Sequence, residues 1–235
     1  MSSTTTYGVG SLEKPEFTAA TRIQESFVAV AEKRMLIWLA HRTPRWINSD
    51  HLTILGFVSQ CLAGVCYALA RWNSDMLLLG IVCLALNWLG DSLDGTLARV
   101  RNRQRPRYGF YVDHVTDTVA AFFLMGGLAL SGYVHSGIAL GMLIAFLMLS
   151  IEAYLATYTL GRFRLSYWKL GPTEIRILLA AGNVALWRNP MVTVLGRQYL
   201  LFDLGGVVAI AGMDLMLVVS AIRHTARLYR EEKIA

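Results

Sequence analysis

Six long apolar segments constrain this 235-residue chain more than any other feature of its sequence. Inside a bilayer, backbone amides have no water to bond, so each such segment must form a helix that satisfies its own hydrogen bonds. A helical span needs about 20 mostly apolar residues. We therefore expect an all-α integral membrane protein with six transmembrane helices. The expected spans are residues 51–70, 76–97, 109–130, 138–160, 172–186 and 205–222.

Composition supports this class and excludes others. Hydrophobic residues make up 55% of the chain and charged residues only 16%, whereas a soluble domain carries about a quarter charged residues. A soluble α/β enzyme and a disordered chain are both excluded. The net charge of +6 would fit a nucleic-acid binder, but basic residues in membrane proteins collect in cytosolic loops. We expect the lipid bilayer as a partner and no nucleic acid.

The distribution of basic residues predicts the orientation. If the N-terminus is inside, the inner segments hold 18 of the 22 Lys and Arg residues. Only Arg71, Arg188 and Arg197 fall in outer loops, and Arg176 falls inside the fifth span. By the positive-inside rule, both termini face the cytosol.

The N-terminal region divides into two segments before the membrane domain. Residues 1–16 are rich in Ser, Thr and Gly and lack the apolar core of a signal peptide, which predicts a flexible tail. Residues 17–46 place apolar side chains near helical spacing among charged ones, which predicts an amphipathic helix on the cytosolic membrane face. Packing of this helix on other protein is the alternative. Residues 47–235 form the expected six-helix domain.

Four aspartates lie within 27 residues, at the end of the second span and the start of the third: Asp91, Asp94, Asp113 and Asp117. One aspartate at the centre of a membrane helix costs ~2.5–3.5 kcal/mol, so such a cluster requires positive charge nearby. The spacings i,i+3 and i,i+4 place each pair on one helix face. Because the second span runs inward and the third outward, the two pairs should meet at the same cytosolic depth.

This residue set predicts a metal-dependent phosphate site. Carboxylates without a cysteine or histidine trio favour a hard cation, most simply Mg²⁺, with Mn²⁺ as an alternative, and can hold two ions ~3.5–4 Å apart. Gly95 and Ala98 share the helix face of Asp91, and Gly109 opens the third span, so a ligand could approach the backbone closely. With Arg99 beside them, these residues favour hydrolysis or transfer at the phosphorus of a diphosphate.

The segment reads Asp-x-x-Asp-Gly-x-x-Ala-Arg, nine further residues, then Gly-x-x-x-Asp-x-x-x-Asp. This pattern resembles the signature of the CDP-alcohol phosphotransferase (CDP-alcohol phosphatidyltransferase) family. The resemblance implies a homodimer in which an alcohol displaces CMP from a CDP-linked donor. It implies metal binding by Asp91, Asp94, Asp113 and Asp117, with Asp117 also acting as general base. It implies nucleotide or diphosphate contacts by Gly95, Ala98, Arg99 and Gly109.

Six further residues are weaker candidates for binding the acceptor or a phosphate: Arg105, Arg107, Glu152, Glu174, Arg176 and Asp214. The first two fit an ordinary cytosolic loop equally well. Glu174 fits the first turn of a helix. Arg176 needs a partner inside the fifth span, and we expect it to face the polar cavity, paired with Glu174.

Glu152 and Asp214 lie about as deep in their spans as Asp117, which suggests one polar cavity, although bonds between helices would explain them equally well. We interpret Thr53, at the start of the first span, and His114, beside Asp113, as structural residues.

These observations predict a membrane transferase that joins a CDP-linked lipid, CDP-diacylglycerol or an archaeal analogue, to a small polar alcohol. We place it in a prokaryotic cell membrane with a cytosolic active site. One alternative is an aminoalcohol phosphotransferase that uses a CDP-choline-type or CDP-ethanolamine-type donor and diacylglycerol. A metal or proton transporter is an alternative of another class, but it would spread its acids along a path through the bilayer. Inositol phosphate, glycerol phosphate, serine and amino alcohols all remain open as acceptors.

Overall fold

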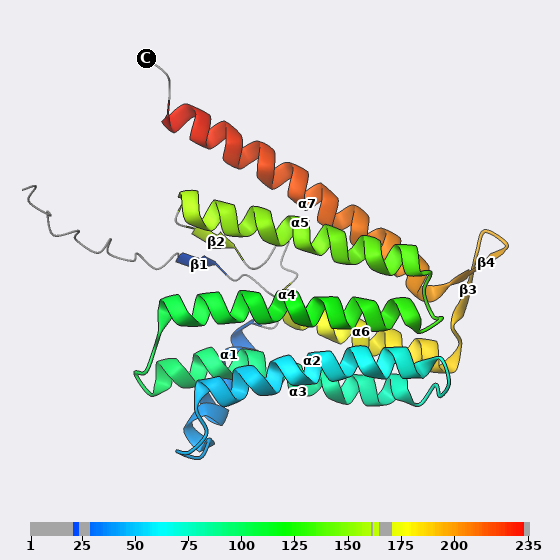
Figure 1. Cartoon of the computed structure of the whole chain (residues 1–235), viewed down its shortest axis with the longest axis horizontal. Helices are drawn as coiled ribbons and strands as arrows, with labels where there is room; N and C mark the ends of the chain where they lie inside the picture. The colour runs from blue at the N-terminus through cyan, green and yellow to red at the C-terminus, as the bar shows by residue number, and fades with distance from the viewer. Residues whose placement is uncertain (1–20, 24–28, 161, 165–170, 233–235) are drawn as a thin grey trace, which may run out of the picture.

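The computed structural model describes residues 21–23, 29–160, 162–164 and 171–232. Over these residues the chain is almost entirely helical, with two short pairs of strands (Figure 1). The helices are α1 (Ala29–Arg42), α2 (Ser49–Ala70), α3 (Met76–Val100), α4 (Pro106–Leu130), α5 (Ser136–Leu160), α6 (Pro172–Arg188) and α7 (Leu201–Glu231). The strands are β1 (Thr21–Ile23), β2 (Arg162–Arg164), β3 (Met191–Val194) and β4 (Arg197–Leu200).

In the part of the chain that the structure describes, four helices, α2, α3, α5 and α7, are long and apolar enough to cross a membrane. This finding confirms the predicted all-α, multi-pass membrane class. The other two expected spans lie in α4 and α6, which do not combine enough length with enough apolar character. Helix α6 has only 17 residues, and the first half of α4 contains two aspartates and a histidine. A total of six spans remains a prediction.

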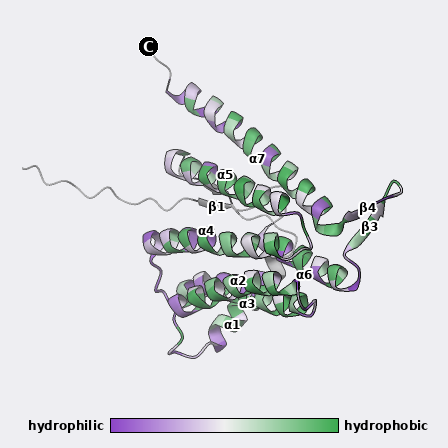
Figure 2. Ribbon diagram, turned by 45° about the vertical axis from the view of Figure 1, so that its right-hand side comes forward, coloured by the Kyte–Doolittle hydropathy of each residue, from purple (hydrophilic) through white to green (hydrophobic). Residues whose placement is uncertain are grey.

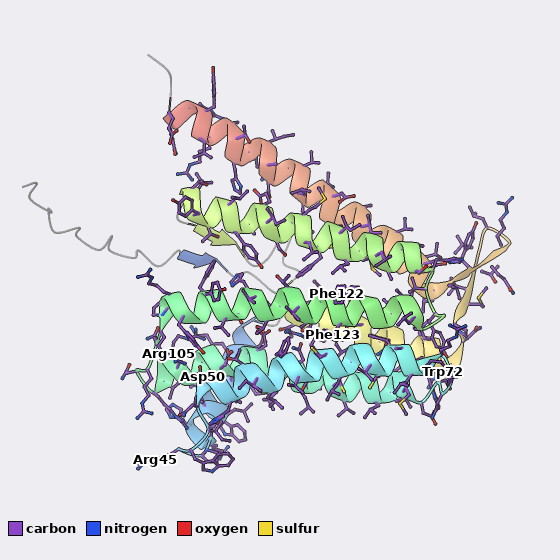
Figure 3. The ribbon with its side chains drawn as sticks, in the orientation of Figure 1. Arg45, Asp50, Trp72, Arg105, Phe122 and Phe123 are labelled. Atoms are coloured by element: carbon purple, nitrogen blue, oxygen red, sulfur yellow. The ribbon has the colours of Figure 1, made fainter. Side chains whose placement is uncertain are left out.

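The helices pack in a chain of neighbours around α2. Helices α3 and α4 both contact α2, α6 and α1 pack on α3, and α5 links α4 to α7. Helices α5 and α7 diverge toward the C-terminus (Figure 1). Hydrophobic residues cover much of the helices, and the segment between α3 and α4 is hydrophilic (Figure 2). Arg45, Asp50 and Arg105 lie at one end of the molecule and Trp72 at the other (Figure 3).

Glycines bring α2 into backbone contact with both neighbours. A Cβ atom at Gly127 of α4 would lie 1.8 Å from the backbone oxygen of Gly64, and one at Gly90 of α3 would lie 2.5 Å from the backbone nitrogen of Gly56. Membrane helices use small residues in this way because close backbone approach maximises van der Waals contact. The two contacts fix the positions of α3 and α4 on either side of α2.

A buried amide attaches α6 to this group. Asn183 is fully buried and accepts a hydrogen bond from the Tyr67 hydroxyl at 2.9 Å. Its own Nδ2 donates to the backbone oxygen of Leu77 at 3.2 Å. Because buried polar groups are costly unless they are bonded, this pair of contacts sets the position of α6 against α2 and α3.

The N-terminal helix is shorter than predicted. The expected helix over residues 17–46 is wrong at both ends, because Thr21–Ile23 is a strand that pairs in parallel with β2 and α1 covers only Ala29–Arg42. Thr43 precedes a proline, which disfavours helical backbone at Thr43. Leu36 and Ala40 pack with α3, so α1 contacts other protein. The predicted tail, residues 1–16, lies outside the described residues.

A short hairpin joins α6 to α7 where only a loop was expected. Strands β3 and β4 pair antiparallel, with Val194 opposite Arg197. The two residues between them, Leu195 and Gly196, both have positive φ angles, 51° and 79°. This backbone suits a tight hairpin turn.

We predict that Gly127→Ala destabilises the protein strongly and that Gly126→Ala does not. The added methyl of the first variant would collide with the backbone of α2, which costs at least about 1–3 kcal/mol in a packed interface. Nothing lies within 4 Å of a Cβ at Gly126, so that variant is the matched control. The thermal midpoint of each variant is measured in detergent from the fraction of protein that remains monodisperse at each temperature. Equal midpoints would contradict the close α2–α4 contact.

Candidate active site

The four motif aspartates line one pocket between α2, α3 and α4. Asp91 and Asp94 come from α3, and Asp113 and Asp117 from α4. The spacing along each helix places the two members of a pair on one face. Because both helices flank α2, the two faces meet. The other lining residues are Thr53, Gly56, Phe57, Gln60, Asn87, Thr116 and Ala120.

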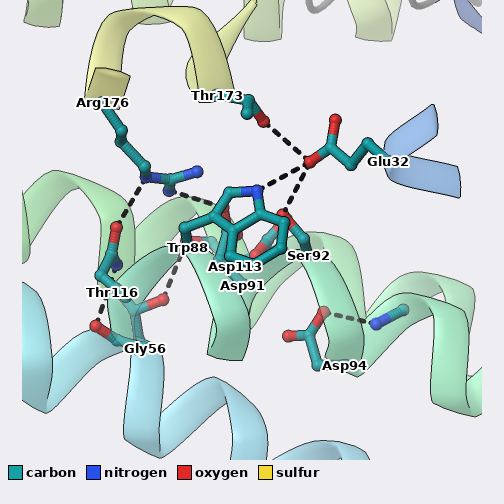
Figure 4. A network of polar contacts seen from close by, with 12 residues as sticks. Glu32, Gly56, Trp88, Asp91, Ser92, Asp94, Asp113, Thr116, Thr173 and Arg176 are labelled. Carbon is teal, nitrogen blue, oxygen red and sulfur yellow. Dashed lines mark hydrogen bonds and ion pairs between the residues drawn. The ribbon is translucent and has the colours of Figure 1, made fainter. Parts of the chain in front are cut away.

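Arg176 brings positive charge to this cluster. Its Nη2 lies 2.6 Å from Oδ2 of Asp91 (Figure 4). Its Nε donates to Oδ1 of Asn87 at 2.8 Å. The amide of Asn87 in turn donates to the backbone oxygen of Gly56 at 2.9 Å. The arginine is therefore held in a fixed orientation by α3, which is itself held by α2.

Arg176 forms an ion pair with Asp91, and its expected pairing with Glu174 stays a prediction. The Glu174 carboxylate accepts a hydrogen bond from the backbone N–H of Gly171 at 2.9 Å and caps the start of α6. Asp91 lies within reach of the arginine, and unpaired N–H groups at the helix start attract the glutamate.

Thr53 contacts the cluster directly. Its hydroxyl donates to Oδ2 of Asp94 at 2.7 Å, and the backbone N–H of Gly95 donates to the other oxygen of the same carboxylate. Thr53 also lines the pocket. The residue that we interpreted as structural therefore orients a motif aspartate.

The donor set suits a hard cation by type, although the described conformation is not a ready metal site. Carboxylate oxygens are the ligands that Mg²⁺ prefers. Among the described residues, no three Asp, Glu, His or Cys side chains are gathered around one point. Asp91 is turned toward Arg176, and Asp94 toward Thr53. Metal binding would require these two carboxylates to share or leave their present partners.

Of the small motif residues, Gly95 lies beside Arg99 near the C-terminal end of α3. The guanidinium of Arg99 donates to Thr96 at 3.0 Å. A Cβ at Gly95 would lie 3.4 Å from the same guanidinium, whereas nothing lies within 4 Å of one at Gly109. Ala98 borders a second pocket, which the start of α2 and the segment between α3 and α4 enclose. Arg105 lines this second pocket, whereas Arg107 is exposed at the start of α4.

Three of the weaker candidates have partners or positions away from the aspartates. Arg105 pairs with Asp50 and lies over the Tyr108 ring. Glu152 of α5 pairs with Nδ1 of His224 on α7 at 2.6 Å. Asp214 is exposed on α7. Neither of these two acids lines the aspartate pocket, so the cavity that we expected them to share with Asp117 is not formed in this structure.

Sequence reasoning missed Asn87 and Gln60. Asn87 precedes Asp91 by one helical turn, so its presence on the aspartate face of α3 follows from spacing. Gln60 follows Thr53 by two turns on α2 and lies on the same face. A search for polar residues one or two turns from the motif would have found both.

We predict that Arg176→Gln lowers thermal stability in EDTA. The variant leaves Asp91, whose side chain is 28% exposed, without its charge partner, at a cost of about 1–3 kcal/mol. Arg227→Gln is the control, because the Arg227–Glu231 side chains are 41% and 50% exposed and such pairs contribute at most about 0.5 kcal/mol. Thermal unfolding of both variants provides the comparison. An unchanged midpoint for Arg176→Gln would show that the ion pair does not support the fold.

No curated protein matches the chain. The family model for CDP-alcohol phosphatidyltransferase matches residues 46–220, which include α2 to α6 and most of α7. The matched range contains the four aspartates of the pocket as well as Arg176. The chain therefore belongs to the CDP-alcohol phosphatidyltransferase family, whose members are transferases of substituted phosphate groups.

Proposed function

We propose that the chain transfers a phosphatidyl group from a CDP-linked lipid, such as CDP-diacylglycerol, to a small polar alcohol and releases CMP. Membership of the family establishes the reaction type. The observation that carries the proposal further is that the four motif aspartates line one pocket. The helices around the pocket carry exposed apolar side chains, and we propose that the lipid-linked donor enters from the bilayer.

Divalent metal would be held by the four motif carboxylates, those of Asp91, Asp94, Asp113 and Asp117. We propose two ions, either Mg²⁺ or Mn²⁺. Metal at this position would supply positive charge to the diphosphate and to the departing CMP.

Asp117 is the proposed general base. The hydroxyl oxygen of the acceptor attacks the phosphorus that carries the lipid, and the phosphorus–oxygen bond to CMP breaks. The proton of that hydroxyl passes to a carboxylate oxygen of Asp117. Gly95, Ala98, Arg99 and Gly109 are proposed to contact the nucleotide and its diphosphate.

Arg176 is proposed to stabilise negative charge on the reacting phosphate. Its guanidinium is fixed by Asn87 and Asp91, and a preorganised cation costs little reorganisation when charge develops. Glu174 would act on the acceptor only through its place in the first turn of α6. Arg107, exposed at the start of α4, is proposed to attract anionic headgroups.

Topology and assembly are part of the same proposal. We place both termini and the pocket on the cytosolic side of a prokaryotic membrane, in agreement with the positions of the basic segments. A homodimer is supported by Asp214, which is exposed on the apolar helix α7. An exposed carboxylate in lipid is costly, and a second subunit could cover it.

The test is a CMP-release assay with the purified full chain in nanodiscs and Mg²⁺. CDP-diacylglycerol is offered with inositol phosphate, glycerol phosphate, serine and amino alcohols in turn. CDP-choline and CDP-ethanolamine with diacylglycerol form the second arm, which tests the aminoalcohol alternative. We expect CMP with CDP-diacylglycerol and one acceptor. If no pair releases CMP, the transferase proposal fails, and metal or proton flux in liposomes tests the transporter alternative.

Asp117→Asn should lower the rate about a hundredfold or more, because it removes the proposed base, while CDP still binds. Asp75→Asn is the control, since Asp75 lies between α2 and α3 at the far end of the helices and accepts a bond from Trp187 at 2.9 Å. Its rate should match that of the unmodified protein. If Asp117→Asn loses CDP binding as well, Asp117 acts mainly in ligand binding.

A further inference from the structure

Glu32 of α1 is the only charged side chain that is buried among the described residues, with 8% of its surface exposed. Its Oε1 accepts hydrogen bonds from Nε1 of Trp88 at 2.8 Å and from the Thr173 hydroxyl at 2.8 Å. The Ser92 hydroxyl donates to the same atom at 3.4 Å. A buried carboxylate is strongly unfavourable without such partners. The side chain therefore joins three helices, α1, α3 and α6, at one point.

The partners of Glu32 lie directly beside the Arg176–Asp91 ion pair (Figure 4). On α3, Trp88 and Ser92 are one turn apart, and Asp91 lies between them. On α6, Thr173 precedes Arg176 by three residues, so the two share a helix face. The carboxylate thus contacts both helices within one turn of the residues that form the ion pair.

The middle of α6 and its first turn are held by different contacts. Asn183 bonds to α2 and α3 near the middle of the helix. At the first turn, Arg176 bonds to α3 directly, and Thr173 bonds to Glu32, which in turn bonds to Trp88 of α3. Loss of Glu32 would therefore leave α6 attached but would remove one of the two polar links at its first turn.

We propose that Glu32 is a positioning residue for the transferase site. By binding Trp88 and Thr173 at once, it holds the first turn of α6 against α3 and keeps the Arg176 guanidinium beside Asp91. This proposal rests on the proposed function for its effect on turnover, but its structural part stands on the contacts alone. It assigns α1, which lies outside the range matched by the family model, a direct part in shaping the site.

The kinetic test uses a matched pair at the α6 side of the contact. Thr173→Val removes the hydroxyl and keeps the shape, whereas Thr173→Ser keeps the hydroxyl. With the substrates found active in the CMP assay, Glu32→Ala and Thr173→Val should each lower kcat about tenfold, with KM for the CDP-lipid within about twofold. Thr173→Ser should retain normal turnover. Equal kcat for Thr173→Val and Thr173→Ser would overturn the proposal.

A double-variant cycle separates positioning from general destabilisation. If Glu32 acts through Arg176, Glu32→Ala should lower kcat no further once Arg176→Gln is present, since interacting residues are not additive. Additive losses in the double variant would show that Glu32 only supports the fold. Thermal midpoints of all variants are measured alongside.

Hydrogen–deuterium exchange tests the structural part without turnover. Peptides that cover residues 172–180 should exchange faster in Glu32→Ala and Thr173→Val than in Thr173→Ser, while α7 peptides stay unchanged. Unchanged exchange in α6 overturns the positioning role. If the unmodified protein releases no CMP but α6 exchange responds as expected, the proposed function fails and the positioning contact stands.

Discussion

Glycine pairs set the distance between α2 and its two neighbours, and the site depends on that distance. Where Gly64 meets Gly127 and Gly56 meets Gly90, no side chain separates the helices. In a membrane, association of helices depends on close packing, because lipid is as apolar as the helices themselves. Only this close approach allows two carboxylates from α3 and two from α4 to line a single pocket.

The cost of charge in an apolar environment explains the rest of the polar arrangement. Acids that meet in one pocket repel one another, and a buried charge must find a partner. Arg176 reaches Asp91 from α6, and Asn87 fixes the arginine to α3. Glu32 is a second charge that has partners: its buried carboxylate accepts hydrogen bonds from three donors, each within one helical turn of the residues of the ion pair. The first turn of α6 is thus held by polar contacts that lie next to the site.

Several features could be predicted from sequence because they depend on local chemistry. Long apolar runs must be helical in lipid, and the spacing of the aspartates determines which face they share. Other features depend on partners far along the chain. The ion pair of Arg176 with Asp91 and the bond of Thr53 to Asp94 follow from which helices are adjacent. The β3–β4 hairpin was missed because Leu-Gly is a weaker signal for this turn than Asn-Gly.

The sequence by itself determined the membrane class, the helical content and the aspartate motif, because apolar length and helical period are properties of a single segment. It also determined the family, since the motif is contiguous. Only the tertiary structure decided which cation meets the acids, that Glu152 pairs with His224 away from the pocket, and that α1 packs on α3 through a buried glutamate. These outcomes depend on packing between segments that lie far apart in the chain, and no local pattern encodes them.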